Sequence, residues 1–294
     1  MKSYLYSGTA EHPVYADVIA AMPGPRRHPI VMLHGGFHNG AGFLATPDGR
    51  EGWASIFARR GHDVYVMDWP GHGRSPAGAD FVRLSMADVG RALGALLQDT
   101  GPAIVFAHSA GGPIAWWVAE QYRTLVAAVV GLAPGPPANL VPALPAEPAA
   151  HADANGGAHP VYAPADRPAF VDRAFIKTFW ANGSRFPQAA FEAYARSIGP
   201  ESPRILNERF NIGGSGLRLS DHGRLRGLPM LVLTGDEDPR HPKALDGALA
   251  AFLGADFLWL PAIGISGNGH MLMIEDNHQE LAARVAGWLG DHGL

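Results

Sequence analysis

The sequence predicts an α/β fold in which a mostly parallel central sheet is flanked by helices and carries a helical lid insertion. Three observations lead to this prediction. Short apolar runs alternate with amphipathic segments through residues 1–132, the pattern returns in residues 229–294, and residues 133–228 show amphipathic segments with no strand-like run between them. Alternation of this kind requires right-handed crossovers and a mostly parallel sheet. Residues 1–132 and 229–294 are therefore predicted to form the core, and residues 133–228 the lid.

The composition is that of a globular protein with little net charge. Of the 294 residues, 47% are apolar and 17% are charged, and the formal net charge is −4. This balance argues against nucleic acid or an anionic membrane as a partner, and no apolar run approaches the ~20 residues that cross a bilayer. The start, Met1 to Gly8, lacks the apolar segment of a secretory signal, so a cytoplasmic location is expected. The absence of cysteine excludes disulfides and thiolate nucleophiles.

The periodicity of the apolar residues places the elements of the first half. Continuous apolar runs predict buried strands, and apolar residues at helical spacing predict helices, one of them beginning at the capping residue Ser85 and ending at Gly101. The strands are expected at residues 14–21, 29–33, 63–68, 104–107 and 125–132, with helices over residues 53–60, 86–100 and after Ser109.

The second half divides into the insertion and the end of the core. Short helices are predicted over residues 170–180, 188–197 and 204–210, followed by strands at 229–234 and 256–260 and helices over 242–253 and 278–289. The lid helices are rich in aromatic residues, and most of these rings are expected to pack the lid on the body. Phe179 and Trp180, together with Phe37 of the core, are predicted to contact the substrate.

The stretch from Ala103 to Trp117 changes from a strand-like to a helical pattern at Ser109. A residue on so tight a strand-to-helix turn has a strained backbone, so the positions two before and two after it must be small. They are Ala107 and Gly111 here. The turn exposes the serine oxygen and leaves the Ala110 amide pointing at the same space, at the positive end of a helix. The alternative is an ordinary turn with a capping serine.

Glycines follow two of the predicted strands. His34-Gly35-Gly36-Phe37 comes directly after the strand at 29–33, and its Gly36 amide is the candidate for a second oxyanion donor, with Phe37 as its neighbour. A plain flexible loop is the alternative. After the strand at 63–68 stands Asp68-Trp-Pro-Gly-His-Gly-Arg-Ser75, in which Asp68 and Arg74 are interpreted as braces of the turn, in preference to a catalytic pair of Asp68 and His72.

Three chemically useful groups follow strands in the order serine, acid, histidine. Ser109 is followed by the acidic segment Gly235-Asp-Glu-Asp238 and by Gly267-Asn-Gly-His270. Functional groups of open α/β sheets gather at the carboxyl ends of strands. A serine needs an imidazole to accept its proton, and a carboxylate fixes the imidazole tautomer. Among the 14 histidines, His270 alone follows the last strand in a glycine-rich turn, whereas His278 begins the last helix and His241 is assigned to a surface turn.

Metal binding is the main rival interpretation of so many histidines. His34 and His38 stand four apart, but Gly35 and Gly36 between them indicate a loop, where this spacing does not align two rings. A His-Glu-x-x-His helix is absent as well. The sequence therefore predicts neither a metal nor another cofactor.

These motifs occur together and in order, and with them the chain resembles the α/β-hydrolase superfamily over nearly its whole length. The resemblance implies a serine-dependent hydrolase with Ser109, Asp238 and His270 as its catalytic triad, and with the Gly36 and Ala110 amides as its oxyanion hole. It favours Asp238 over Asp236, because the acid of the superfamily usually stands three positions beyond the glycine that ends this strand.

A narrower resemblance complicates the choice of acid. The segments from Ala45 to Trp53 and from Gly267 to Met273 are similar to those of a group that contains bifunctional bacterial esterases and zearalenone lactonases. In that group the acid is a glutamate in a Glu-Pro-Gly context, where this chain has Ala133-Pro-Gly135. Either Asp238 supplies the carboxylate from the later strand, which is the interpretation we favour, or the chain is an impaired relative.

The expected function is hydrolysis of a small-molecule carboxylic ester or lactone through an acyl-enzyme. Two alternatives stay open: hydrolysis of a carbon–carbon bond in a β-diketone with the same triad, and a binding protein that holds a small ligand with little turnover. Hydrolysis of epoxides or haloalkanes is disfavoured because it uses a carboxylate nucleophile at the position of Ser109. The sequence leaves the oligomeric state open, with a homodimer among the states it allows.

Overall fold

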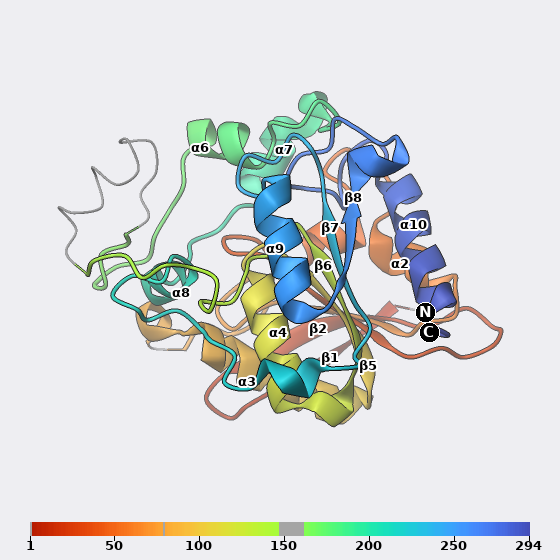
Figure 1. Ribbon diagram of the computed structural model, residues 1–294, viewed down its shortest axis with the longest axis horizontal. Coiled ribbons are helices and arrows are strands. Elements are labelled where there is room, and N and C mark those ends of the chain that lie inside the picture. The colour runs from red at the N-terminus through yellow and green to blue at the C-terminus, as the bar shows by residue number, and fades with distance from the viewer. Residues whose placement is uncertain (1, 79, 147–161) are drawn as a thin grey trace.

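The computed structural model describes residues 2–78, 80–146 and 162–294 (Figure 1). Its centre is an eight-stranded sheet with the order β1-β2-β4-β3-β5-β6-β7-β8. β1 and β2 form an antiparallel hairpin that pairs antiparallel with β4, and all pairs from β4 to β8 are parallel. The mostly parallel sheet predicted from the alternating pattern is confirmed. The strands are β1 Lys2–Gly8, β2 Pro13–Ile19, β3 Ile30–Leu33, β4 Val64–Met67, β5 Ala103–His108, β6 Val126–Leu132, β7 Met230–Thr234 and β8 Asp256–Trp259.

Helices cover both faces of the sheet, which explains why the central strands are continuous apolar runs. Every residue of β3, β5 and β7 is buried. One face packs against α3, α4 and α9, and the other against α2 and α10 (Figure 1). These helices are α2 Trp53–Ala58, α3 Met86–Thr100, α4 Gly111–Gln121, α9 Lys243–Leu253 and α10 His278–Asp291, with the short α1 Ala41–Leu44 before them. Ser85 caps α3 in a capping box with Asp88, as predicted.

The described residues between β6 and β7 form short helices and no named strand. They are α6 Arg173–Phe179, the 3-10 turn η3 Gln188–Ala190, α7 Phe191–Arg196, α8 Pro203–Arg209 and the 3-10 turn η4 His222–Leu225. Ile176, Trp180, Phe186 and Tyr194 are buried in the same apolar cluster as the core residues of α2 and α10. Most of these rings thus pack the insertion on the body. The division into core and lid domains at residues 133 and 228 stays a prediction.

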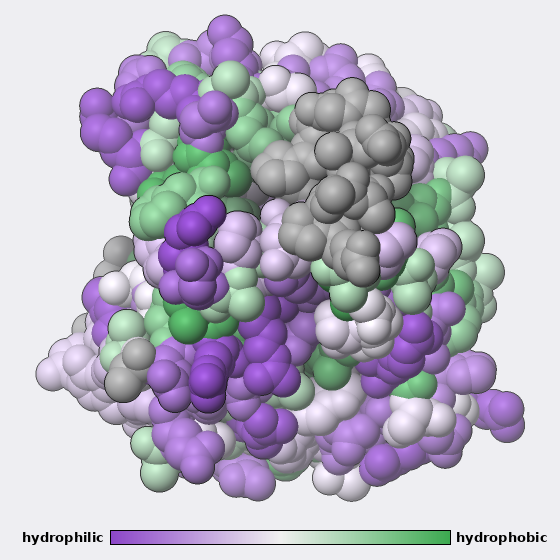
Figure 2. All heavy atoms as spheres, turned by 90° about the vertical axis from the view of Figure 1, so that its left-hand side faces the viewer, coloured by the Kyte–Doolittle hydropathy of each residue, from purple (hydrophilic) through white to green (hydrophobic). Residues whose placement is uncertain are grey.

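Apolar side chains on the surface gather beside the insertion. On the face shown in Figure 2, apolar residues cluster in the upper half, at the level of the helices between β6 and β7, while the lower half is largely hydrophilic. Phe170, which precedes α6 in the sequence, is 74% exposed. Among the described residues, no helix is both long and apolar enough to span a membrane.

The hairpin strand β1 was not expected from the sequence. Tyr4 and Tyr6 stay 64% and 60% exposed, and Leu5 between them is only partly buried, so the strand lacks the run of buried apolar residues that marks the central strands. Their rings instead pack with Tyr15 of β2. The short elements α1 and η4 also lacked a sequence signal, because each is too short to show helical periodicity, whereas η3 and α7 together occupy the helix predicted over residues 188–197.

Candidate active site

Ser109 stands at the sharp turn between β5 and α4. Its φ angle is +52°, a left-handed conformation that is strained for a residue with a side chain. The turn needs small neighbours, since a Cβ atom at Gly35 would lie 2.8 Å from the Ser109 Cβ, and one at Gly111 would lie 2.8 Å from the His34 carbonyl oxygen. The strand-to-helix corner predicted from the sequence is present.

A chain of hydrogen bonds joins Ser109 to two buried groups. The Ser109 hydroxyl lies 2.9 Å from Nε2 of His270, and Nδ1 of His270 lies 2.7 Å from Oδ2 of Asp238. An ionised carboxylate only accepts, so Nδ1 carries the ring proton and Nε2 is free to accept the serine proton. His108, directly before the serine, places its Nε2 3.0 Å from the His270 carbonyl oxygen and so fixes the backbone of the histidine. The structure brings together the serine, histidine and acid that the sequence suggested.

The structure distinguishes the two candidate aspartates. Asp238 is buried against His270, whereas Asp236 is exposed and accepts a hydrogen bond from the Gly267 amide. Ala133, at the position of the glutamate in the narrower group, is buried with a φ of +42°. The His270 imidazole is therefore paired with Asp238, a carboxylate of the loop after β7. The hydrogen-bond chain is complete without a glutamate at position 133.

The electrostatics keep the carboxylate charged and the imidazole neutral. Burial opposes ionisation of Asp238, but His270 and His241 outweigh it and lower its pKa to about 2. Burial lowers the pKa of His270 below its ordinary value, although Asp238 acts in the opposite direction. A neutral imidazole beside a serine hydroxyl can accept its proton when the oxygen attacks a carbonyl carbon.

The two residues of the predicted oxyanion hole lie at the cavity beside Ser109. Gly36 and Ala110 line it, and within the described part of the chain neither amide donates a hydrogen bond. The neighbouring Phe37 amide is occupied, because it donates to Oε2 of Glu201 at 2.9 Å. Of the two residues considered in the glycine-rich loop, Gly36 thus has the free donor.

Glu201 is a buried residue near this loop that no sequence motif marked. Its carboxylate accepts hydrogen bonds from the amides of Phe37 and Ser202, and His72 Nε2 lies 3.3 Å from Oε1. The pKa of His72 is raised, since the attraction of Glu201 exceeds the opposing effect of burial. A lone glutamate in the insertion has no pattern that the sequence could reveal, because two of its partners, Phe37 and His72, lie more than a hundred residues away.

The turn after β4 is braced as predicted. Oδ1 of Asp68 accepts from the Gly40 amide at 2.7 Å, and Oδ2 accepts from the backbone and side chain of Arg74. His72 faces Glu201 instead of pairing with Asp68. The interpretation of this motif as structural is therefore supported by its contacts.

His241 corrects one sequence assignment. It is 1% exposed, its ring is centred 5.4 Å from that of His270, and Nδ1 lies 3.1 Å from Asp246, so it does not belong to a surface turn. Asp238, His241 and His270 have potential ligand atoms within 4.8 Å of one another. Both ring nitrogens of His270 are already engaged with Ser109 and Asp238. The geometry suits proton transfer better than metal coordination, and the absence of a metal stays a prediction.

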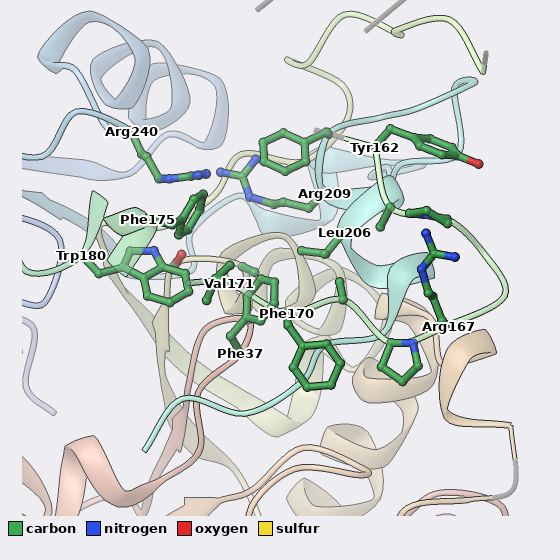
Figure 3. A pocket seen from close by; sticks show the side chains of 18 of the residues that line it. Phe37, Tyr162, Arg167, Phe170, Val171, Phe175, Trp180, Leu206, Arg209 and Arg240 are labelled. Carbon is green, nitrogen blue, oxygen red and sulfur yellow. The ribbon is translucent and has the colours of Figure 1, made fainter. Parts of the chain in front are cut away.

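A cavity of about 420 Å³ opens over Ser109 (Figure 3). Phe37 and Trp180 line it, as the sequence analysis expected of substrate contacts, but Phe179 is not among its lining residues. Phe179 packs against Phe175, with ring centroids 4.9 Å apart, and Phe175 is the ring that faces the cavity. Helical spacing could not tell which of two rings on α6 turns inward. Arg209 and Arg240 also line the cavity, and no sequence motif marked either residue.

The chain is similar to known hydrolases over most of its length. It is 24% identical to the probable secreted lipase phiG of Fungal sp. (strain ATCC 74256), in an alignment that covers 94% of this chain and 85% of that protein. That name calls the relative secreted, and the cytoplasmic location expected for this chain stays a prediction.

Solved structures share the fold. A thermophilic esterase from Thermogutta terrifontis matches with a TM-score of 0.68 and 18% identity, covering 99% of this chain and 98% of that one. The N-acyl homoserine lactonase AidH matches with a TM-score of 0.68 and 21% identity, covering 99% and 97%. The sequence pattern of the alpha/beta hydrolase family matches residues 30–284, and the chain therefore belongs to the alpha/beta hydrolase family.

Proposed function

We propose that this alpha/beta hydrolase cleaves a carboxylic ester or a lactone through an acyl-enzyme formed on Ser109. The observation that carries the proposal is the continuous hydrogen-bond chain from the Ser109 hydroxyl through His270 to Asp238. The names of similar proteins, which include a lipase, an esterase and a lactonase, support ester hydrolysis. With Asp238 beside His270, the missing glutamate at Ala133 no longer favours a binding protein.

The proposed reaction has two halves, formation of the acyl-enzyme and its hydrolysis. The Ser109 oxygen attacks the carbonyl carbon while its proton passes to Nε2 of His270, and Asp238 stabilises the imidazolium. The Gly36 and Ala110 amides donate to the oxyanion of the tetrahedral intermediate. The carbon–oxygen bond then breaks, and His270 protonates the departing alcohol, which stays tethered when the substrate is a lactone. Water next attacks the acyl-enzyme and gives a proton to His270. The bond between the acyl carbon and the Ser109 oxygen then breaks, and His270 returns the proton to that oxygen, which releases the carboxylic acid and restores the Ser109 hydroxyl.

The proposal is tested with a p-nitrophenyl ester and a fluorophosphonate that labels activated serines. Ser109→Ala should lower kcat by more than about 10⁴-fold and abolish the mass increase on labelling, with an unchanged circular dichroism spectrum. Ser215→Ala, at an exposed serine, is the matched control and should keep both activity and label. Turnover retained by Ser109→Ala would overturn the proposal.

A further inference from the structure

Three arginines line the cavity that contains Ser109. Arg167 lies 3.7 Å from the carboxylate of Asp166, and the other two are Arg209 and Arg240. Arg209 ends α8, and Arg240 lies in the loop after β7, two residues beyond Asp238. Figure 3 shows that the guanidinium groups of Arg209 and Arg240 point toward one another at the edge of the cavity. Both lie near the same Phe210 ring, with Cζ atoms 5.8 and 5.9 Å from its centroid. Two like charges are thus gathered on one side of a largely apolar cavity.

Neither guanidinium has a carboxylate partner within the described ranges. No carboxylate oxygen of those residues lies within 4.0 Å of either group, and Nε of Arg240 is buried without a hydrogen-bond partner. Other arginines of the same insertion are paired, Arg204 with Glu208 at 2.9 Å and Arg173 with Glu192 at 2.7 Å. The two arginines that face one another therefore differ from their neighbours in lacking a protein anion.

The nearest acids are engaged elsewhere. Asp238 binds His270 and the Arg240 amide, and Asp246 binds Thr234 and His241. Their attraction on Arg209 is weaker than the effect of burial, which lowers the pKa of that arginine. Burial and the charge of Arg209 lower the pKa of Arg240 to about 10. An anion placed between the two guanidiniums would relieve this cost.

The aromatic neighbours hold Arg240 in position without using its donors. Its Cζ atom lies 5.0 Å from the Phe175 ring centroid and 4.8 Å from that of Phe179. Such contacts use the face of the guanidinium and leave its N–H edge free for hydrogen bonds. The planar fork of an arginine matches a carboxylate, which can bind through two parallel hydrogen bonds.

We infer that Arg209 and Arg240 form a carboxylate-binding subsite, so that the preferred substrate is an ester or lactone that carries a second, free carboxylate. The inference rests on the proposed hydrolase function. The rival explanation is that Arg240 only braces α6 through its aromatic contacts. A brace would affect every substrate equally, whereas a subsite discriminates between charged and neutral substrates.

The experiment compares two substrates with the same leaving group and chain length. These are the p-nitrophenyl monoester of glutaric acid, which is anionic, and p-nitrophenyl pentanoate, which is neutral. The wild type should have the higher kcat/KM for the anionic ester. Arg209→Gln and Arg240→Gln should each lower the ratio of the two kcat/KM values about tenfold or more, mainly through KM for the anionic ester. Arg173→Gln, at the exposed end of α6, should leave the ratio unchanged. Equal losses on both esters, or a wild type that prefers the neutral ester, would overturn the subsite.

A binding measurement separates this inference from the proposed function. Ser109→Ala protein should bind monomethyl glutarate in calorimetry, and addition of Arg240→Gln should weaken that binding about tenfold. If neither p-nitrophenyl ester is hydrolysed but binding behaves in this way, the hydrolase proposal fails while the subsite stands. Absence of binding, or binding that Arg240→Gln does not change, would refute the subsite.

Discussion

The amide of Phe37 donates a hydrogen bond of 2.9 Å to the buried carboxylate of Glu201. The contact links the insertion between β6 and β7 to the loop that contains Gly36. Phe37 needs this support, because its φ angle of +65° is strained for a residue with a side chain. We therefore interpret Glu201 as a positioning residue, which holds the Gly36 amide toward Ser109 without touching the substrate.

Glu201→Gln should lower kcat about tenfold and change KM little. The Phe37 and Ser202 amides donate to different oxygens of the carboxylate, so the glutamine NH2 group would replace one acceptor and face an N–H donor, and the loop should shift. The expected loss is smaller than the 10²- to 10³-fold effect of deleting an oxyanion donor. Steady-state kinetics with p-nitrophenyl pentanoate measure it, with Glu192→Gln, at an exposed glutamate of α7, as the control. An unchanged kcat would show that the loop keeps its geometry without the carboxylate.

Asp238→Asn should lower kcat about 10⁴-fold, because an amide at this position favours the wrong tautomer of His270. Asp236→Asn is the matched control, since Asp236 is exposed and bonds only the Gly267 amide among the described residues. It should retain nearly full activity. Comparison of the two variants with the same ester decides which aspartate acts, and the reverse order of activities would contradict the hydrogen-bond chain described here.

The core of the fold could be predicted because its signals are local. The strands β3, β5 and β7 are continuous apolar runs, and the corner at Ser109 shows itself by small neighbours within two residues. The triad could be ordered along the chain because each member follows a strand of a parallel sheet. The choice of Asp238 needed the resemblance to a known superfamily, since three acidic residues stand side by side at 236–238.

What the sequence could not reveal depends on long-range contacts. Glu201 acts on Phe37 across 164 residues, and Arg209 of α8 lines the same cavity as Arg240 of the loop after β7. Single charged residues of this kind look like ordinary surface residues until the chain is folded. Phe179 was misplaced for a related reason, because periodicity gives the face of a helix but not which ring reaches a cavity.

Glu275 should make the free energy of unfolding depend on pH. It is fully buried, accepts hydrogen bonds from the Gly269 amide and the Asn268 side chain, and burial raises its pKa from 4.5 to about 7. Below pH 4.5 both states are protonated, and as the pH rises toward 7 only the unfolded state releases the proton. Its contribution to stability is therefore present at low pH and lost as the pH rises through 7.

The measurement is urea unfolding of the wild type and of Glu275→Gln, which mimics the protonated acid. The stability of the wild type relative to the variant should fall by about 3 kcal/mol between pH 4.5 and 8. The pH-dependent contributions of the other titrating groups are shared by the wild type and the variant, so they cancel in the difference between the two free energies of unfolding. Glu280→Gln, at a half-exposed glutamate of α10, should show no such trend. A difference that does not vary with pH would mean that Glu275 stays ionised in the folded protein.

Gly35→Ala should impair both folding and activity, because a Cβ atom there would lie 2.8 Å from the Ser109 Cβ and 3.0 Å from Nδ1 of His108. Neither neighbour can yield easily, since one bears the nucleophile and the other is buried and bonded to the His270 carbonyl. We expect a loss of stability of about 1–3 kcal/mol and at least about a tenfold lower kcat, because a displaced oxygen no longer lines up with His270.

Gly287→Ala is the matched control. Gly287 lies inside α10, and no atom lies within 4 Å of the added Cβ, so the substitution should stabilise the protein by about 0.5–1 kcal/mol. Thermal unfolding and ester kinetics on both variants check the pair, and a Gly35→Ala protein as stable and active as the wild type would show that the loop after β3 can move away from Ser109 at little cost.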